Sequence, residues 1–140
     1  MKFNTKGNAE MENNVLKPNG SGIGRIIKAG RCSMQGFKAV YKYEAAFRQE
    51  LLLAVVMFPV SFFVATDLIQ LALLNGAMLI VLLVEIINSA LEAVVDRIGL
   101  EWHELSGRAK DLGSSAVLLS LMLYGLIWIS IIYKNFLVGN

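Results

Sequence analysis

Carboxylate and amide side chains recur at helical spacing in one otherwise apolar stretch of the chain. Glu85, Asn88, Glu92 and Asp96 follow one another at intervals of three or four residues. At 100° per residue these four side chains and Ser89 fall within an arc of about 100° on one helix face. Carboxylates gathered on one face can hold a hard cation or accept a proton, so this face is the first candidate for chemistry.

The depth of Glu85 in the apolar stretch argues for a functional role. Glu85 lies twelve residues before Arg97, or about 18 Å along a helix. A structural interpretation is an interhelical hydrogen bond or ion pair, but no Lys or Arg lies in the apolar run to pair with it. Ionisable groups inside a membrane span usually serve function. We expect these carboxylates to bind Mg²⁺, which is usually held by one or two carboxylates together with substrate phosphates.

The composition of the chain predicts an integral membrane protein. The chain has 140 residues, 56% of them hydrophobic and 17% charged, and its mean hydropathy is +0.57. These values are too apolar for a soluble domain of this length. The net charge of +2 does not indicate a nucleic-acid partner. Cys32 is the single cysteine, which excludes an internal disulfide and a cysteine-cluster metal site.

Long apolar runs predict an all-α fold with three spanning helices, since a span needs roughly 20 residues. The expected spans cover residues 48–66, 68–96 and 112–133. The very short link at Thr66 and Asp67 predicts that the first two spans form an antiparallel hairpin.

The segments outside the apolar runs complete the expected organisation. Residues 1–24 are expected to form a flexible tail, and residues 25–140 one membrane domain. Apolar residues of 25–47 share one stripe and bases lie largely elsewhere, which predicts an amphipathic surface helix carrying Glu44, with a break or bend at Gly30 and Gly36. Residues 97–111 are expected to form a cytoplasmic loop.

The distribution of bases predicts the orientation in the membrane. Nine of the 13 Lys and Arg residues precede residue 50, three lie in 97–111, and only Lys134 remains. Cytoplasmic segments carry the excess of Lys and Arg. The N-terminus is therefore expected in the cytoplasm and the C-terminus on the outer side of the membrane.

Four polar runs resemble one known family. RIIKA at 25–29, EAAFRQE at 44–50, VEIINSALEAVVDRIG at 84–99 and EWHELSGRAKDLGSSAVL at 101–118 closely resemble the small integral-membrane diacylglycerol kinases of Gram-negative bacteria. The resemblance implies a three-span enzyme of the bacterial inner membrane that phosphorylates diacylglycerol with MgATP to give phosphatidic acid. It also implies a homotrimer, and because three thin helices cannot easily enclose both substrates, we expect active sites shared between subunits.

The resemblance also implies roles for individual residues. Glu85 matches the general base of the family with Asn88 beside it as the second catalytic residue, and Glu44 and Glu92 match its metal-holding carboxylates. Positions implied to bind ATP are Arg25, Lys28, Cys32, Glu44, Glu92, Glu101, Trp102, His103, Lys110 and Asp111. Positions implied to bind lipid are Arg25, Ala46, Arg48, Glu50, Glu85 and Ser114. Cys32 departs from the family, which commonly has an aromatic residue there, near the adenine.

Two alternatives remain open from the sequence. An undecaprenol kinase of the same fold would use the same machinery on a polyprenyl alcohol. A non-enzymatic membrane assembly or channel subunit would also use polar helix faces, but it would not need Lys110, Asp111 or Glu44. Phosphorylation assays with both lipids distinguish the three possibilities.

Overall fold

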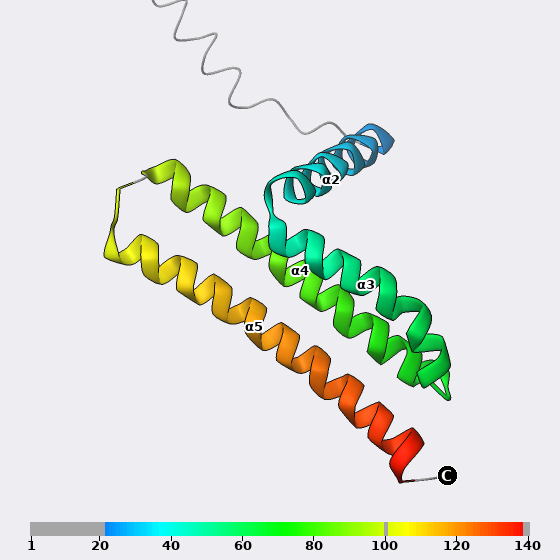
Figure 1. Ribbon diagram of the computed structural model, residues 1–140. Coiled ribbons are helices and arrows are strands. Elements are labelled where there is room, and N and C mark those ends of the chain that lie inside the picture. Colours follow the sequence, from blue (N-terminus) through cyan, green and yellow to red (C-terminus); the bar gives the residue numbers. More distant parts are fainter. Residues whose placement is uncertain (1–21, 100, 139–140) are drawn as a thin grey trace, which may run out of the picture. The chain divides into compact units, whose positions relative to one another are not determined.

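The computed structural model describes residues 22–99 and 101–138, and these residues form helices and no strands (Figure 1). The elements are α2 (Ile23–Tyr43), α3 (Ala45–Val64), α4 (Leu68–Ile98), α5 (Glu104–Ile132) and the short π-helix η1 (Tyr133–Leu137). The expected tail, 1–24, lies almost entirely outside the described residues. The chain divides into two compact units after Lys38.

Helix α2 continues without interruption through Gly30 and Gly36, so the expected break at these glycines is wrong. A glycine inside a helix costs about 1 kcal/mol relative to alanine, which a helix of 21 residues tolerates. Most of its side chains are exposed, including Ile27 and Phe37, and Val40 is its buried residue.

The junction between α2 and α3 lies at Glu44, which has an extended backbone with φ −103° and ψ 115°. The Arg48 guanidinium fixes this junction, because its Nη1 donates to the carbonyl oxygens of Tyr41 at 2.9 Å and Lys42 at 3.3 Å. The last carbonyls of a helix have no partner within the helix, and a base can satisfy them. Glu44 therefore sits between two helices instead of on the surface helix expected over 25–47.

Three helices are long and apolar enough to cross a membrane: α3, α4 and α5 together with η1. This finding confirms the predicted number of spans. Helix α3 reaches 20 residues because its polar start, including Arg48 and Glu50, belongs to the helix. Helices α3 and α4 run antiparallel, as the short link predicts (Figure 1). Asp67 caps α4, because its Oδ1 accepts the backbone N–H of Gln70 at 2.9 Å.

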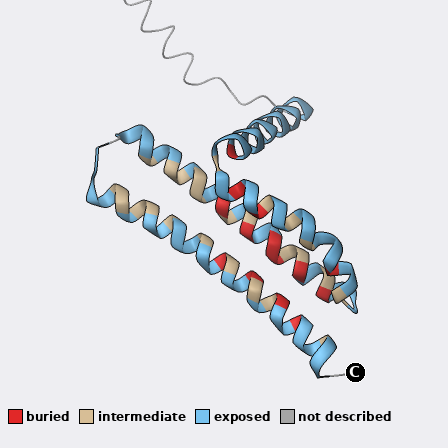
Figure 2. Cartoon of the chain, in the orientation of Figure 1, coloured by how far each residue is buried: buried red, intermediate tan, exposed pale blue. Residues whose placement is uncertain are grey.

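Helix α4 is central to the second unit, since it packs against both α3 and α5. The buried apolar cluster comprises Leu74, Ala77, Met78 and Val81 of α4 with Tyr124, Trp128 and Ile131 of α5. Partly buried residues of α3, such as Ala54 and Met57, pack against this cluster. Only 22% of the apolar window of each spanning helix is buried, and Figure 2 shows exposed positions along all three. Most of each helix surface is therefore free for lipid or other protein.

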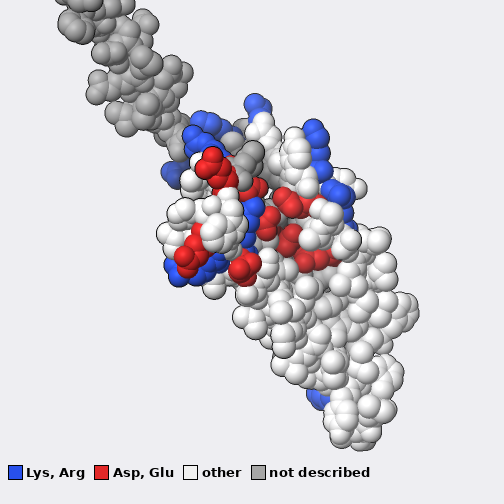
Figure 3. Space-filling view, turned by 60° about the vertical axis from the view of Figure 1, so that its left-hand side comes forward, with Lys and Arg blue, Asp and Glu red and all other residues white. Residues whose placement is uncertain are grey.

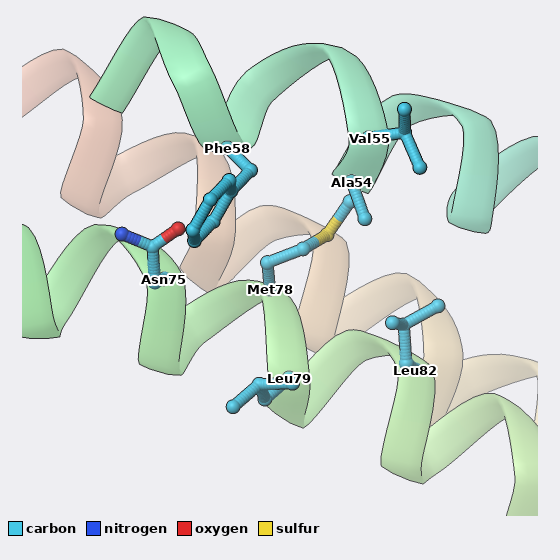
Figure 4. Close-up of a pocket in the computed structure, with 7 residues that line it drawn as sticks. All are labelled: Ala54, Val55, Phe58, Asn75, Met78, Leu79 and Leu82. Carbon is cyan, nitrogen blue, oxygen red and sulfur yellow. The ribbon is translucent and has the colours of Figure 1, made fainter. Parts of the chain in front are cut away.

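An apolar cavity of about 380 Å³ lies between α3 and α4. Figure 4 shows Phe58, Met78 and Leu82 among the side chains around it, with Asn75 as its polar member. The Asn75 amide nitrogen donates to Ser61 Oγ and to the Leu71 carbonyl, both at 2.9 Å. No charged side chain lines this cavity, so it is unsuited to phosphate chemistry and the candidate site lies elsewhere.

Helix α5 begins at Glu104, seven residues before the end of the loop expected over 97–111. Lys110 and Asp111 therefore lie on a helix. His103 caps this helix, because its Nδ1 accepts the backbone N–H of Leu105 at 3.2 Å. The polarity of the first two turns suggested a loop, but a capped amphipathic helix can extend beyond its apolar section.

Candidate active site

A cavity of about 250 Å³ lies where α3 begins, α4 approaches its end and α5 has completed its first turns. It is lined by Glu44, Ala46, Glu85, Asn88, Glu92, Ser114 and Val117. We call this cavity the acidic pocket. Except for Val117, each of these residues was a site residue expected from the sequence. The fold therefore brings together residues from three helical segments that are far apart in the chain.

The acidic pocket combines burial with accumulated negative charge. Glu85 is 3% exposed, and neighbouring Glu50 of α3 is 8% exposed with a buried Oε2 that has no hydrogen-bond partner among the described residues. The carboxylates of Glu50, Glu44 and Glu92 all lie close enough to Glu85 for Coulomb repulsion to matter. Buried carboxylates in such a group are expensive unless a cation or a proton compensates them.

Asn88 and Glu92 are joined one turn apart on α4. The Asn88 Nδ2 donates to Glu92 Oε1 at 3.1 Å. The Asn88 Oδ1 is buried and has no hydrogen-bond partner within the described ranges. Buried polar atoms without partners are uncommon and call for an explanation, such as a ligand. The amide is thus held in place through its nitrogen, while its oxygen accepts no hydrogen bond within the described ranges.

The carboxylate of Glu44, at the junction between α2 and α3, makes no capping hydrogen bond, although Glu44 occupies the N-cap position of α3. Its carboxylate is therefore available to a ligand, and Glu44 lines the acidic pocket together with residues of α4.

The donor set fits Mg²⁺ shared with a phosphate ligand. Across the described residues, no three His, Cys, Asp or Glu side chains come close enough to hold a metal ion by themselves. Magnesium usually takes one or two carboxylates together with water and substrate phosphates. Glu44 and Glu92 offer two hard carboxylate ligands, and the open side of the pocket leaves room for phosphate oxygens.

An ion pair joins α4 to α5 one turn beyond the acidic pocket. Lys110 Nζ lies 2.6 Å from Asp96 Oδ1, and both side chains are partly exposed. Asp96 belongs to the polar face expected on α4, but its pairing with Lys110 was not expected. Figure 3 shows acidic side chains gathered toward one end of the spanning helices and an almost uncharged surface over most of their length.

The other expected site residues lie outside the acidic pocket. Glu101, Trp102 and His103 form the exposed connection between α4 and α5, where Trp102 is 87% exposed. Asp111 is exposed on α5, and its carbonyl accepts the hydroxyl of Ser115 at 2.7 Å.

The first unit holds the remaining expected nucleotide residues. Arg25, Lys28 and Cys32 line, together with Ala29, a cavity of about 280 Å³ on α2. Two bases one turn apart beside a cavity can attract phosphate groups. The structure thus brings these three residues together within their own unit.

One residue beside the acidic pocket was not predicted from the sequence. Gly113 of α5 faces Asn88 so closely that a Cβ at this position would overlap Asn88 Oδ1. Its signal in the sequence is only a glycine next to Ser114 in an apolar helix. Glycines in helices are ambiguous, because many simply face open space.

Three helices able to cross a membrane, with an acidic pocket among them, define a helical integral-membrane protein. Residues 31–132 match the family described as prokaryotic diacylglycerol kinase. The chain is 48% identical to a diacylglycerol kinase of Escherichia coli K12 over 121 residues, which are 84% of this chain and 97% of that relative. It is 43% identical to one of Haemophilus influenzae over 113 residues, 81% of this chain and 96% of that relative.

A third relative, the diacylglycerol kinase of Pseudomonas aeruginosa, is 44% identical over 112 residues, covering 80% of this chain and 91% of its own length. The chain belongs to the prokaryotic diacylglycerol kinase family. The resemblance carried by the four polar runs is therefore confirmed.

Proposed function

We propose that this protein transfers the terminal phosphate of ATP to the free hydroxyl of diacylglycerol, giving phosphatidic acid and ADP. The observation that carries the proposal is the acidic pocket, in which the buried Glu85 of a membrane-spanning helix meets Glu44 and Glu92. Membership of the family and the names of the relatives support the substrate and the reaction. The lipid hydroxyl can reach Glu85 from the membrane while ATP remains in water.

Glu85 is the proposed general base. The lipid oxygen attacks the terminal phosphorus, the bond to the bridging oxygen of ATP breaks, and the hydroxyl proton passes to the Glu85 carboxylate. Asn88 is the second proposed catalytic residue, and its Nδ2 holds the Glu92 carboxylate by a hydrogen bond. Glu44 and Glu92 would hold Mg²⁺, which when bound neutralises charge on the phosphates.

The substrate contacts follow from the residues expected in the sequence. For ATP, the proposed contacts beyond Glu44 and Glu92 are Arg25, Lys28, Cys32, Glu101, Trp102, His103, Lys110 and Asp111. For the lipid, they are Arg25, Ala46, Arg48, Glu50, Glu85 and Ser114. The shared cavity of Arg25, Lys28 and Cys32 and the presence of Ala46 and Ser114 in the acidic pocket support these assignments.

The proposed location is the bacterial inner membrane, with the N-terminus in the cytoplasm and the C-terminus in the periplasm. The excess of bases up to the first turn of α3, together with Arg97 at the end of α4 and Arg108 and Lys110 in the first turns of α5, supports this orientation. Helix α2 is proposed to lie on the cytoplasmic surface, because it exposes both bases and large apolar side chains such as Ile27 and Phe37.

The proposed assembly is a homotrimer whose active sites are shared between subunits. Most of the surface of the spanning helices remains exposed in the single chain. In lipid, helices associate through close packing and polar contacts. On α4, Asn75 bonds Ser61 and Ala77 is buried within the single chain. A Cβ added to Gly76 would meet no atom within 4 Å, and Ala90 is exposed, so these two small residues are available for packing against another subunit.

Mixing inactive subunits tests the shared sites. We expect Glu85→Gln subunits reassembled with Glu44→Gln subunits to recover part of the activity, because some composite sites would combine an intact Glu85 with an intact Glu44. Activity and subunit composition are measured on the same mixed trimers. Background activity in confirmed mixed trimers would mean that each site is built within one chain.

The function itself is tested with purified protein in mixed micelles, comparing diacylglycerol and undecaprenol as acceptors of phosphate from ATP. We expect turnover with diacylglycerol. Turnover with undecaprenol alone would establish the polyprenol kinase, which the names of the relatives do not favour. The absence of turnover with either lipid would leave the non-enzymatic assembly subunit.

A further inference from the structure

We infer that Gly113 is a positioning residue for phosphoryl transfer: its lack of a side chain lets Asn88 keep its hydrogen bond to Glu92 inside the acidic pocket. The inference rests on the proposed function of that pocket. It concerns a contact between α4 and α5 that neither the spacing of polar residues nor a helix propensity indicates.

The close approach of Gly113 to Asn88 is the first observation. A Cβ on Gly113 would overlap Asn88 Oδ1 and would stand 3.2 Å from Asn88 Cγ. At the other two described glycines of α5, Gly107 and Gly125, an added Cβ would meet nothing within 4 Å. Gly113 is thus set apart from its neighbours by a specific contact.

The hydrogen bonding of the Asn88 amide is the second observation. Its Nδ2 donates to Glu92 Oε1 at 3.1 Å, while Oδ1 is the atom that faces Gly113. The amide group is planar, so a rotation that moves Oδ1 away from a new methyl group also moves Nδ2. Relief of the overlap would therefore release the Glu92 carboxylate from its partner.

Separation of the two helices would be the other way to relieve the overlap. The buried cluster that includes Leu74, Tyr124 and Trp128 holds α4 against α5. Packed interiors resist such displacement, whereas a half-buried side chain can rotate at lower cost. We therefore expect the side chain of Asn88 to move first.

Glu92 gives this movement a chemical consequence. It is a proposed Mg²⁺ ligand, and a ligating carboxylate is usually held in orientation by a second hydrogen bond. Ser114, the next residue after Gly113, also lines the acidic pocket. A change at position 113 should therefore appear in the magnesium dependence as well as in the rate.

The experiment compares Gly113→Ala with Gly125→Ala in the full-length protein in mixed micelles. We expect Gly113→Ala to lower kcat on the order of 10-fold, as for loss of a hydrogen bond to a charged group, and to raise the magnesium concentration needed for half-maximal rate. Gly125→Ala places the same methyl group on the same helix and should stay within about twofold of the unchanged protein. Equal behaviour of the two variants would overturn the inference.

A double-mutant cycle identifies Asn88 as the side chain through which Gly113 acts. Asn88→Ala removes the atoms that the new methyl group would meet. In the Asn88→Ala background, Gly113→Ala should change the residual kcat and the magnesium dependence by less than about twofold. An undiminished effect in that background would show that the alanine acts elsewhere and would overturn the inference.

The thermal stability of the unchanged protein, the two single variants and the double variant gives a second measurement that does not depend on activity. If Gly113→Ala is unstable, the double variant should recover the stability of Asn88→Ala, because the overlap is gone. A double variant as unstable as Gly113→Ala would overturn the inference. Failure of the unchanged protein to phosphorylate diacylglycerol would instead refute the proposed function, and the stability cycle would still decide the contact.

Discussion

Two polar clusters occupy the spanning helices, and they differ in how completely their hydrogen bonds are made. The acidic pocket lies near the end of α4, and the second cluster lies at the link between α3 and α4. We call the second cluster the turn cluster; it consists of Thr66, Asp67, Gln70 and Asn135. The comparison separates polar residues that hold the fold from polar residues that are available for chemistry.

Gln70 connects the turn cluster. Its Nε2 donates to Thr66 Oγ1 and to Asp67 Oδ2, both at 3.0 Å. From the π-helix η1, Asn135 Nδ2 donates to Gln70 Oε1 at 2.6 Å and to the Val64 carbonyl at 2.8 Å. The amide of Gln70 is thus bonded through both its nitrogen and its oxygen, and the cluster ties the end of the third span to the hairpin of the first two.

The acidic pocket has the opposite character. Asn88 Oδ1 in the pocket and Glu50 Oε2 beside it are buried and lack partners in the part of the chain that the structure describes. Leaving a buried acceptor unsatisfied costs about 1–3 kcal/mol. A satisfied polar network rigidifies a fold, whereas unsatisfied groups gathered in a cavity are typical of a site that a ligand completes. Loss of a pocket residue should therefore affect rate, and loss of a turn-cluster residue should affect stability.

The largest effect on the rate of phosphorylation is expected from replacing Glu85. Glu85→Gln keeps the size of the side chain but cannot accept the hydroxyl proton at neutral pH, so diacylglycerol phosphorylation should fall on the order of 100-fold or more. The rate is measured in mixed micelles, with thermal stability followed in parallel. Glu104→Gln, which changes an exposed carboxylate at the start of α5, is the matched control. Near-normal activity of Glu85→Gln would remove Glu85 from the role of general base.

A smaller effect is expected at the proposed metal ligands. Glu44→Gln and Glu92→Gln should each shift the magnesium titration of the rate to severalfold higher concentrations, because a hard cation loses a charged oxygen ligand. The same Glu104→Gln control should titrate like the unchanged protein. Unchanged titrations in both pocket variants would mean that the cation is held by other residues.

The smallest effect on rate is expected in the turn cluster. Asn135→Leu removes the two hydrogen bonds to Gln70 and Val64 and should lower the free energy of unfolding by about 1–2 kcal/mol, while kcat stays within about twofold. Ser130→Ala is the control, since that hydroxyl bonds only its own helix, at the Leu126 carbonyl. Thermal inactivation and rate are measured on both. A loss of kcat as large as that of a pocket variant would contradict the separation of the two clusters.

The sequence could predict what depends on spacing along one helix. The polar face with Glu85, Asn88 and Glu92 follows from 100° per residue, and the three spans follow from apolar runs of sufficient length. The family resemblance added Glu44, Ala46 and Ser114, which lie on other helical segments. Their side chains do line one cavity with the α4 residues.

The limits of helices were predicted less well than their number. Polarity suggested a loop through Lys110 and Asp111, but the helix continues, since its first turns can be polar and still hydrogen bonded. Likewise the extended backbone of Glu44 depends on Arg48, whose guanidinium binds the end of the preceding helix. Such ends are decided by side-chain contacts that periodicity does not contain.

The sequence by itself determined the membrane class, the number of spans and the carboxylates available to one helix face, because these follow from hydropathy and helical period. Only the tertiary structure decided which side chains meet where the helices pack. The pair of Asp96 with Lys110, the fit of Asn88 against Gly113 and the bond of Asn135 to Gln70 all cross between helices. The physical reason is that such contacts depend on the rotation and separation of packed helices, which the spacing along either helix alone does not specify.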